Sequence, residues 1–253
     1  MNRFKPDKCD AQRHRDFAAL SCGRHGLLAP TDEVVLRAAA TDAEVYPAGA
    51  DLVREGERLN RPRLLLEGWA ARQRVLTDGR RQIYTFMLPG DAFGLSAHAH
   101  GGNTATSVAL TGAVVAATPV LADAIGREVH DPLSQFAWNM ILQEEISGMD
   151  QIVRLGRQTA YERVLHLMLE FFHRLSAVGL VSGTSFTMPL TQEVIADALG
   201  LSVVHTNRTL QQLRRERLIE THGNVLTLPN IDLLIEIADF RTSDVPAGVR
   251  LAS

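Results

Sequence analysis

The chain has 253 residues, more than the roughly 100 to 150 of a typical domain, so we expect two domains with separate cores. Its 45% hydrophobic and 22% charged residues, with a net charge of -3, are typical of a soluble globular protein. No apolar run approaches the roughly 20 residues of a membrane span, and the first residues lack the apolar stretch of a secretory signal, so we expect no membrane partner and a cytoplasmic protein.

Residues 1–30 are polar and irregular, and they are predicted to form an N-terminal arm. Cys9 and Cys22, the only cysteines of the chain, are too few for a disulfide framework. Together with His14 and His25 they are possible zinc or iron ligands, but their spacing matches no compact metal finger. We therefore predict neither a metal site nor a cofactor. A metal- or redox-responsive regulator that uses these side chains stays open as an alternative.

Residues 31–130 are predicted to form a domain built mainly of short strands. It begins with a helical segment at 31–42, which Thr31 can cap. Short apolar or alternating runs follow, and Ala-Gly, Glu-Gly and Asp-Gly pairs separate them. The clearest hairpin turns at Asp78-Gly79, between "ARQRVLT" and "RRQIYTFML". Strands at such regular spacing indicate a sandwich or barrel.

A long helix is predicted at residues 131–157, because Asp131 is a good N-cap and Pro132 is favoured at the first helical position. Apolar side chains recur along it at spacings of four and three, as in a coiled coil. We define this stripe as Trp138, Leu142, Ile146, Met149 and Val153. We expect it to be the interface of a homodimer. The alternative, that it packs on the predicted strands, stays open.

Residues 158–240 are predicted to form a C-terminal domain, followed by a tail at 241–253. Its first helix begins at a capping box formed by Thr159 and Glu162, and it ends near Gly179.

A helix-turn-helix pattern comes next. Thr191 can cap a helix that runs to about Leu199, and Gly200 allows a sharp turn. Ser202 then caps a second helix that runs to about Arg217. The run "LIETHGNVLTL" after it indicates a hairpin, or wing, that turns near Gly223-Asn224.

The second helix of this pattern has two distinct faces. Thr206, Leu210 and Leu213 are expected to face the first helix. The other face carries side chains that suit base edges, namely Val204, Asn207, Arg208 and Gln211. Arginines 208, 214, 215 and 217 accompany a single acid, Glu216, within "GLSVVHTNRTLQQLRRERL". Double-stranded DNA is therefore the predicted partner, with the arginines near phosphates.

From about residue 25 to 230 the chain resembles the CRP/FNR superfamily of bacterial transcription regulators. The matching stretches are "YPAGADLVREGE", "LLLEGWAARQRVLTDGRRQIYTFMLPGDAFGL" and "LTQEVIADALGLSVVHTNRTLQQLRRERLI". The resemblance implies an α+β fold: an N-terminal antiparallel β-roll of the double-stranded jelly-roll type, a long dimerisation helix and a C-terminal winged helix-turn-helix. It also implies a homodimer that binds a palindromic operator, with RNA polymerase as a further partner.

The resemblance places Arg208 at the position of the arginine that reads a guanine in the major groove. Thr191 and Ser202 match positions near backbone phosphates. Val204 stands where many relatives have a glutamate, so their half-site sequences do not transfer to this chain. The DNA-binding residues predicted in this way are Thr191, Ser202, Val203, Val204, His205, Asn207, Arg208 and Gln211.

The segment after "PGDAFG" departs from the nucleotide-binding members of the superfamily. Leu95 stands at the position of the glutamate that binds the ribose, and Asn103 at that of the arginine that binds the cyclic phosphate. Leucine accepts no hydrogen bond and asparagine carries no charge, so we do not expect control by cyclic AMP. Two alternatives stay open: a pocket for an unknown small-molecule effector, and a roll that is only a scaffold. The candidate pocket residues are Gly94, Leu95, Ser96, Asn103 and Thr104.

Other functions have less support in the sequence. His98 and His100 lie in "AHAHGG", which indicates a polar loop rather than a metal site. The iron–sulfur sensors that the resemblance brings in need four cysteines, and this chain has two. It has no G-x-S-x-G, H-E-x-x-H or Walker A motif, so we predict no catalytic residues and no enzyme. A ligand-sensing or scaffolding protein with a degenerate helix-turn-helix is the remaining alternative.

Overall fold

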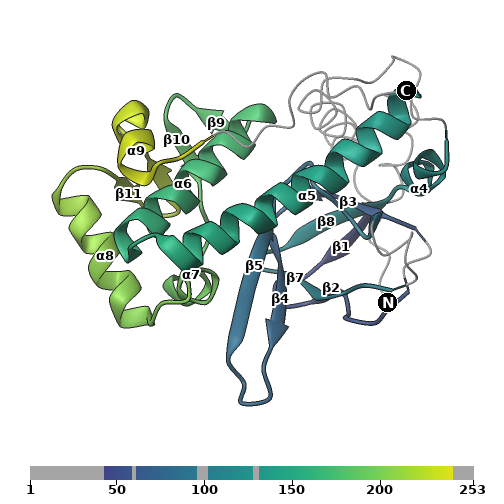
Figure 1. Cartoon of the computed structure of the whole chain (residues 1–253), viewed down its shortest axis with the longest axis horizontal. Coiled ribbons are helices and arrows are strands. Elements are labelled where there is room, and N and C mark those ends of the chain that lie inside the picture. The colour runs from purple at the N-terminus through teal and green to yellow at the C-terminus, as the bar shows by residue number, and fades with distance from the viewer. Residues whose placement is uncertain (1–42, 59–60, 96–101, 128–130, 242–253) are drawn as a thin grey trace. The chain divides into compact units, whose positions relative to one another are not determined.

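The structure is a computed structural model that describes residues 43–58, 61–95, 102–127 and 131–241 (Figure 1). The described residues form two compact units. The N-terminal unit comprises residues up to 72 together with 86–145, and the C-terminal unit comprises 73–85 together with residues from 146 onward. The predicted arm and the helix predicted at 31–42 lie outside the described residues.

The N-terminal half contains the short antiparallel strands that the glycine pairs predicted. Two four-stranded sheets have the strand orders β1-β8-β3-β6 and β2-β7-β4-β5. At the Asp78-Gly79 turn, the amide of Gly79 donates to the carbonyl of Leu76 over 2.9 Å, which confirms that hairpin. The strands are β1 (Ala43–Tyr46), β2 (Asp51–Val53), β3 (Arg63–Glu67), β4 (Ala70–Val75), β5 (Arg81–Met87), β6 (Ala92–Phe93), β7 (Thr106–Ala109) and β8 (Ala113–Ala117).

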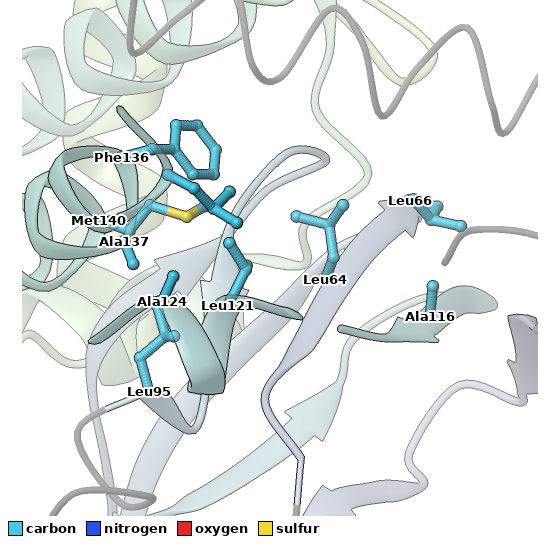
Figure 2. Close-up of a cluster of buried hydrophobic side chains, with 10 residues drawn as sticks. Leu64, Leu66, Leu95, Ala116, Leu121, Ala124, Phe136, Ala137 and Met140 are labelled. Atoms are coloured by element: carbon cyan, nitrogen blue, oxygen red, sulfur yellow. The ribbon is translucent and has the colours of Figure 1, made fainter. Parts of the chain in front are cut away.

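Two helices follow the strands, α4 (Pro119–Ile125) and α5 (Pro132–Arg157). The Asp131 carboxylate accepts from the amide of Ser134 over 3.0 Å, so the predicted start of the long helix is confirmed. An apolar core joins both helices to strands β3 and β8, as Figure 2 shows. Its buried members are Leu64, Leu66, Leu95, Ala116, Leu121, Ala124, Leu133, Phe136, Ala137 and Met140.

The side chains of α5 that enter this core are not those of the predicted stripe. Leu133, Phe136 and Met140 point into the core, whereas Trp138 is 43% exposed. Met149 and Val153, farther along the helix, are 50% and 52% exposed. Trp138 is therefore not part of this core.

The C-terminal unit contains the expected helix-turn-helix and wing. Its four-stranded sheet has the order β11-β12-β10-β9, and its neighbouring strands are antiparallel. The hairpin of β9 and β10 was not predicted. The elements are α6 (Ala160–Ala177), β9 (Val181–Ser182), β10 (Ser185–Thr187), α7 (Gln192–Leu199), α8 (Val203–Arg215), β11 (Glu220–His222), β12 (Val225–Thr227) and α9 (Ile231–Ala238).

A buried charged network joins the end of α5 to α6 within this unit. Arg154, 3% exposed, donates to Glu170 over 2.5 Å and to Gln151 over 2.6 Å, and it lies 3.1 Å from Nδ1 of His166. Arg174 donates to the other oxygen of Glu170 over 2.7 Å. Burial alone would raise the pKa of Glu170, but Arg154 and Arg174 lower it to about 2. The carboxylate therefore stays charged and holds the two helices together.

His166 belongs to the same network. Burial is the main cause that lowers its pKa, from 6.5 to about 4, and the neighbouring Arg154 lowers it further. The neutral ring meets Phe240 edge-on, with 5.0 Å between the ring centroids.

We expect the protein to lose stability as the pH falls from about 6.5 to about 4, because the unfolded chain binds a proton at His166 in this window and the folded chain does not. His166→Gln keeps an acceptor for Arg154 but cannot titrate, so the stability of the variant should depend less steeply on pH. Thermal unfolding between pH 7 and pH 4 measures the difference. If His173→Gln on the same helix flattens the dependence equally, the buried network is not its source.

Candidate DNA-binding surface

The helix-turn-helix is built by local hydrogen bonds at the predicted positions. The hydroxyl of Thr191 accepts from the amide of Val194 over 3.2 Å at the start of α7. Gly200 ends that helix in the left-handed conformation, with φ of 63°, which a residue with a side chain adopts at a cost. The hydroxyl of Ser202 accepts from the amide of His205 over 3.2 Å and starts α8. The two caps and the glycine therefore define the turn.

One face of α8 packs inward and holds the helix in place. Thr206, Leu210 and Leu213 are 0%, 3% and 0% exposed, as the sequence predicted. Helix α8 contacts both α7 and α6 in this packing. Ile195 and Leu199 of α7 are buried as well.

The opposite face of α8 is open to solvent. Val204 is 62% exposed, and Arg208 and Gln211 are exposed on the next two turns. Asn207, beside Arg208, is half-buried. Val203 and His205 at the start of the helix are also exposed. Val204, Asn207, Arg208 and Gln211 are three or four positions apart and lie on one face, so the structure brings together an alkyl group, a guanidinium and two amides.

Basic side chains continue this surface at the far end of α8. Arg214, Arg215 and Arg217 are all exposed. Glu216, the one acid among them, accepts from the hydroxyl of Tyr161 in α6 and from Gln212 over 3.0 Å. Burial and this carboxylate raise the pKa of Tyr161 to about 12, so the phenol keeps its proton. Glu216 therefore ties the end of α8 to α6.

Four side chains from outside the helix-turn-helix hold the end of α7, and sequence reasoning missed these contacts. One of them is Gln82 of β5, which donates to the carbonyl of Ala198 over 3.2 Å. Arg163 of α6 donates to the carbonyl of Leu199 over 2.9 Å and to that of Leu155 over 2.8 Å. Gln151 of α5 donates to the carbonyl of Ala198 over 2.5 Å.

Arg81, in the part of β5 that belongs to the C-terminal unit, pairs with Asp197 over 2.6 Å. The hydrogen bonds from Arg163 and Gln151 satisfy carbonyl groups that a helix leaves without a partner at its last turn. Arg81 holds the same end of α7 through the carboxylate of Asp197. These contacts therefore fix the helix that precedes the turn.

The residues predicted for an effector pocket have structural partners of their own. Leu95 is 2% exposed and lies in the apolar core of the N-terminal unit. Asn103 donates from its side-chain amide to the carbonyl of Glu57 over 2.8 Å, and its carbonyl accepts from Gly56 over 2.8 Å. Gly94 is buried and Thr104 is exposed, whereas Ser96 lies outside the described residues.

The possible metal ligands of the sequence also lie outside the described residues: Cys9, His14, Cys22, His25, His98 and His100. Within the described part of the chain, no group of three or more His, Cys, Asp or Glu side chains is placed to hold a metal ion. No helix of that part is long and apolar enough to cross a membrane.

The predicted dimer stripe has an exposed apolar surface on the last turns of α5. Ile152, which the sequence prediction left out, is 71% exposed and lies between Met149 and Val153. Leu142 and Ile146 are half-buried. Ile152 lies three positions after Met149 and Val153 lies four, and the alternation of threes and fours selected Val153.

Each half of the chain matches a known domain family. Residues 43–120 match the cyclic nucleotide-binding domain, and residues 162–237 match the Crp-like helix-turn-helix domain. These matches agree with the β-roll and the winged helix-turn-helix that the sequence resemblance implied.

Two relatives align with about two thirds or more of the chain. The transcriptional activatory protein AadR of Rhodopseudomonas palustris is 32% identical over 195 residues, which is 77% of this chain and 80% of AadR. The nitrogen fixation regulation protein FixK of Bradyrhizobium diazoefficiens is 32% identical over 168 residues, 65% of this chain and 68% of FixK.

The structure of FixK2 from Bradyrhizobium japonicum superposes with a TM-score of 0.67 at 28% identity, covering 77% of this chain and 95% of FixK2. The chain thus shares its fold with a solved regulator and most of its length with sequence relatives that regulate transcription, and it belongs to the CRP/FNR family of DNA-binding transcription regulators.

Proposed function

We propose that this regulator reads a palindromic operator as a homodimer, with one helix α8 in the major groove of each half-site. The observation that carries the proposal is the exposed face of α8, where Val204, Arg208 and Gln211 lie on consecutive turns. A guanidinium can bond O6 and N7 of a guanine at once, and an amide suits adenine. Arg208 reads the guanine, while Thr191 and Ser202 lie near phosphates.

The homodimer forms through the stripe on α5. Trp138, Met149, Ile152 and Val153 are each at least 43% exposed, which is a large apolar area for one side of a single helix. Pairing with the same stripe of a second chain removes this surface from water and gives the two-fold symmetry that a palindrome requires.

The test is selection of binding sites from a randomised duplex library, followed by titration of the best site at several salt concentrations. We expect a palindrome whose half-sites are centred about 10 base pairs apart, or a multiple of that distance. Binding that depends on salt but not on sequence would contradict the proposal. It would favour the alternative of a ligand-sensing or scaffolding roll with a degenerate helix-turn-helix.

The proposed regulator has a second partner besides DNA. AadR is a transcriptional activatory protein, which supports RNA polymerase as a second partner of this chain. We assign the regulator to the cytoplasm, without a catalytic role. Residues 31–130 form the sensor part in this scheme, 131–157 the dimerisation helix and 158–240 the DNA-binding part.

We expect neither cyclic AMP nor cyclic GMP to control the protein. Leu95 is packed in the apolar core, and the amide of Asn103 is bonded to the carbonyl of Glu57, so neither residue offers what a ribose or a cyclic phosphate needs. Calorimetry with each nucleotide, together with operator binding in its presence, measures this. Micromolar binding of a cyclic nucleotide that also raises the affinity for the operator would overturn the expectation. It would show that another cationic side chain pairs with the cyclic phosphate.

A further inference from the structure

Helix α8 begins with two valines that the fold leaves in solvent. Val203 is 46% exposed and Val204 is 62% exposed, although buried apolar side chains fill the opposite face of the same helix. Neither valine contributes to the cores described above, so packing does not account for their apolar side chains.

The two valines lie at different angles around the axis of α8. Val204 lies one turn before Arg208 and two turns before Gln211, so these three side chains share one face. Val203 lies about 100° around the helix from Val204 and off this face. Side chains in the first turns of a recognition helix are those that contact base edges. Only Val204 therefore stands beside the guanine-reading arginine.

An isopropyl group can recognise only one feature of the major groove. Each base presents hydrogen-bond donors or acceptors there, and thymine alone adds an apolar group, the methyl at C5. We infer that Val204 is a specificity-determining residue that contacts a thymine methyl in the half-site that Arg208 reads. This inference rests on the proposed function, because it needs α8 to lie in the major groove.

The inference predicts one feature of the operator. Each half-site should contain a thymine at a fixed distance from the guanine that Arg208 contacts. Placing a glutamate at this position, by Val204→Glu, should move the preference at that base pair toward cytosine, whose amino group can donate to a carboxylate.

The experiment uses the operator selected by the intact protein. Thymines are replaced by deoxyuridine at one pair of symmetric positions at a time, which removes only the C5 methyl and keeps the base pair. At one position, loss of the methyl should weaken binding about fourfold per half-site and about 15-fold for the dimer, the scale of one buried methyl group. The Val204→Ala variant lacks the two Cγ methyl groups, so it should discriminate much less between the two forms of that operator.

Val45→Ala is the matched control, because it makes the same change at a valine of β1 that is 54% exposed and is not among the predicted DNA-binding residues. It should keep the full sensitivity to deoxyuridine. The inference is overturned if the intact protein binds the thymine and deoxyuridine operators equally at every position, or if Val204→Ala is as sensitive as the intact chain. In both cases tight binding to the selected site leaves the proposed function standing, whereas a protein that selects no site overturns both.

Discussion

Replacing Arg208 with alanine is expected to weaken binding to the selected operator by about 100-fold or more, since each bidentate contact to guanine contributes about 1 to 3 kcal/mol and a dimer makes two. The side chain is exposed on α8, so its loss should leave the fold and its thermal stability almost unchanged. Binding to random duplex DNA should fall far less, because that binding depends on charge rather than on base edges.

Arg215→Ala is the control variant, because Arg215 is also exposed on α8 but lies at the far end of the helix, near Glu216. If Arg215 contacts a phosphate, its loss should weaken binding to operator and random DNA by the same factor and reduce the salt dependence. Titrations of both variants with the operator and with random duplex DNA distinguish a contact to a base from a contact to a phosphate. An equal loss on both DNAs for Arg208→Ala would mean that Arg208 contacts only phosphate.

The helix-turn-helix could be predicted from sequence because its signals are local. The hydroxyls of Thr191 and Ser202 accept from amides only a few residues ahead, and Gly200 acts through its own backbone angle. Residue type and spacing are then sufficient evidence. The hairpin at Asp78-Gly79 was predictable for the same reason.

The contacts that hold α7 in place could not be predicted in this way. Arg163 reaches the carbonyl of Leu199 across 36 positions of sequence, and Gln151 reaches that of Ala198 across 47. Any carbonyl can accept these donors, so no residue type at the receiving end marks the pairing. Only the packing of α5 and α6 brings the donors there.

The sequence pattern also did not predict the short strands β9 and β10 or the burial of Leu95. Strands β9 and β10 have two and three residues, and β10 pairs with the distant β12, so their own sequence shows no clear alternation. The sequence placed Leu95 in a candidate pocket, but the structure buries it in a core with α4 and α5. Family position alone did not show whether this side chain faces a ligand or the core.

Val153→Glu is expected to convert the proposed dimer into monomers. The valine is 52% exposed in the single chain, so a carboxylate there costs the monomer little. In a dimer the two carboxylates would be buried in an apolar seam without a partner, at a cost of several kcal/mol for each charge. The dissociation constant of the dimer should therefore rise about 10³-fold or more.

Sedimentation of the intact protein and of Val153→Glu over a range of concentrations measures the change in the dissociation constant of the dimer. Val45→Glu makes the same substitution at a valine of β1 that is 54% exposed, so it controls for the added charge and should leave the dimer intact. Ile146→Glu tests the half-buried middle of the stripe, where we expect dissociation together with some loss of stability. Because each half-site binds one chain, the Val153→Glu variant should also lose affinity for the palindrome but not for a single half-site. A dimer that survives Val153→Glu would place the interface on another surface.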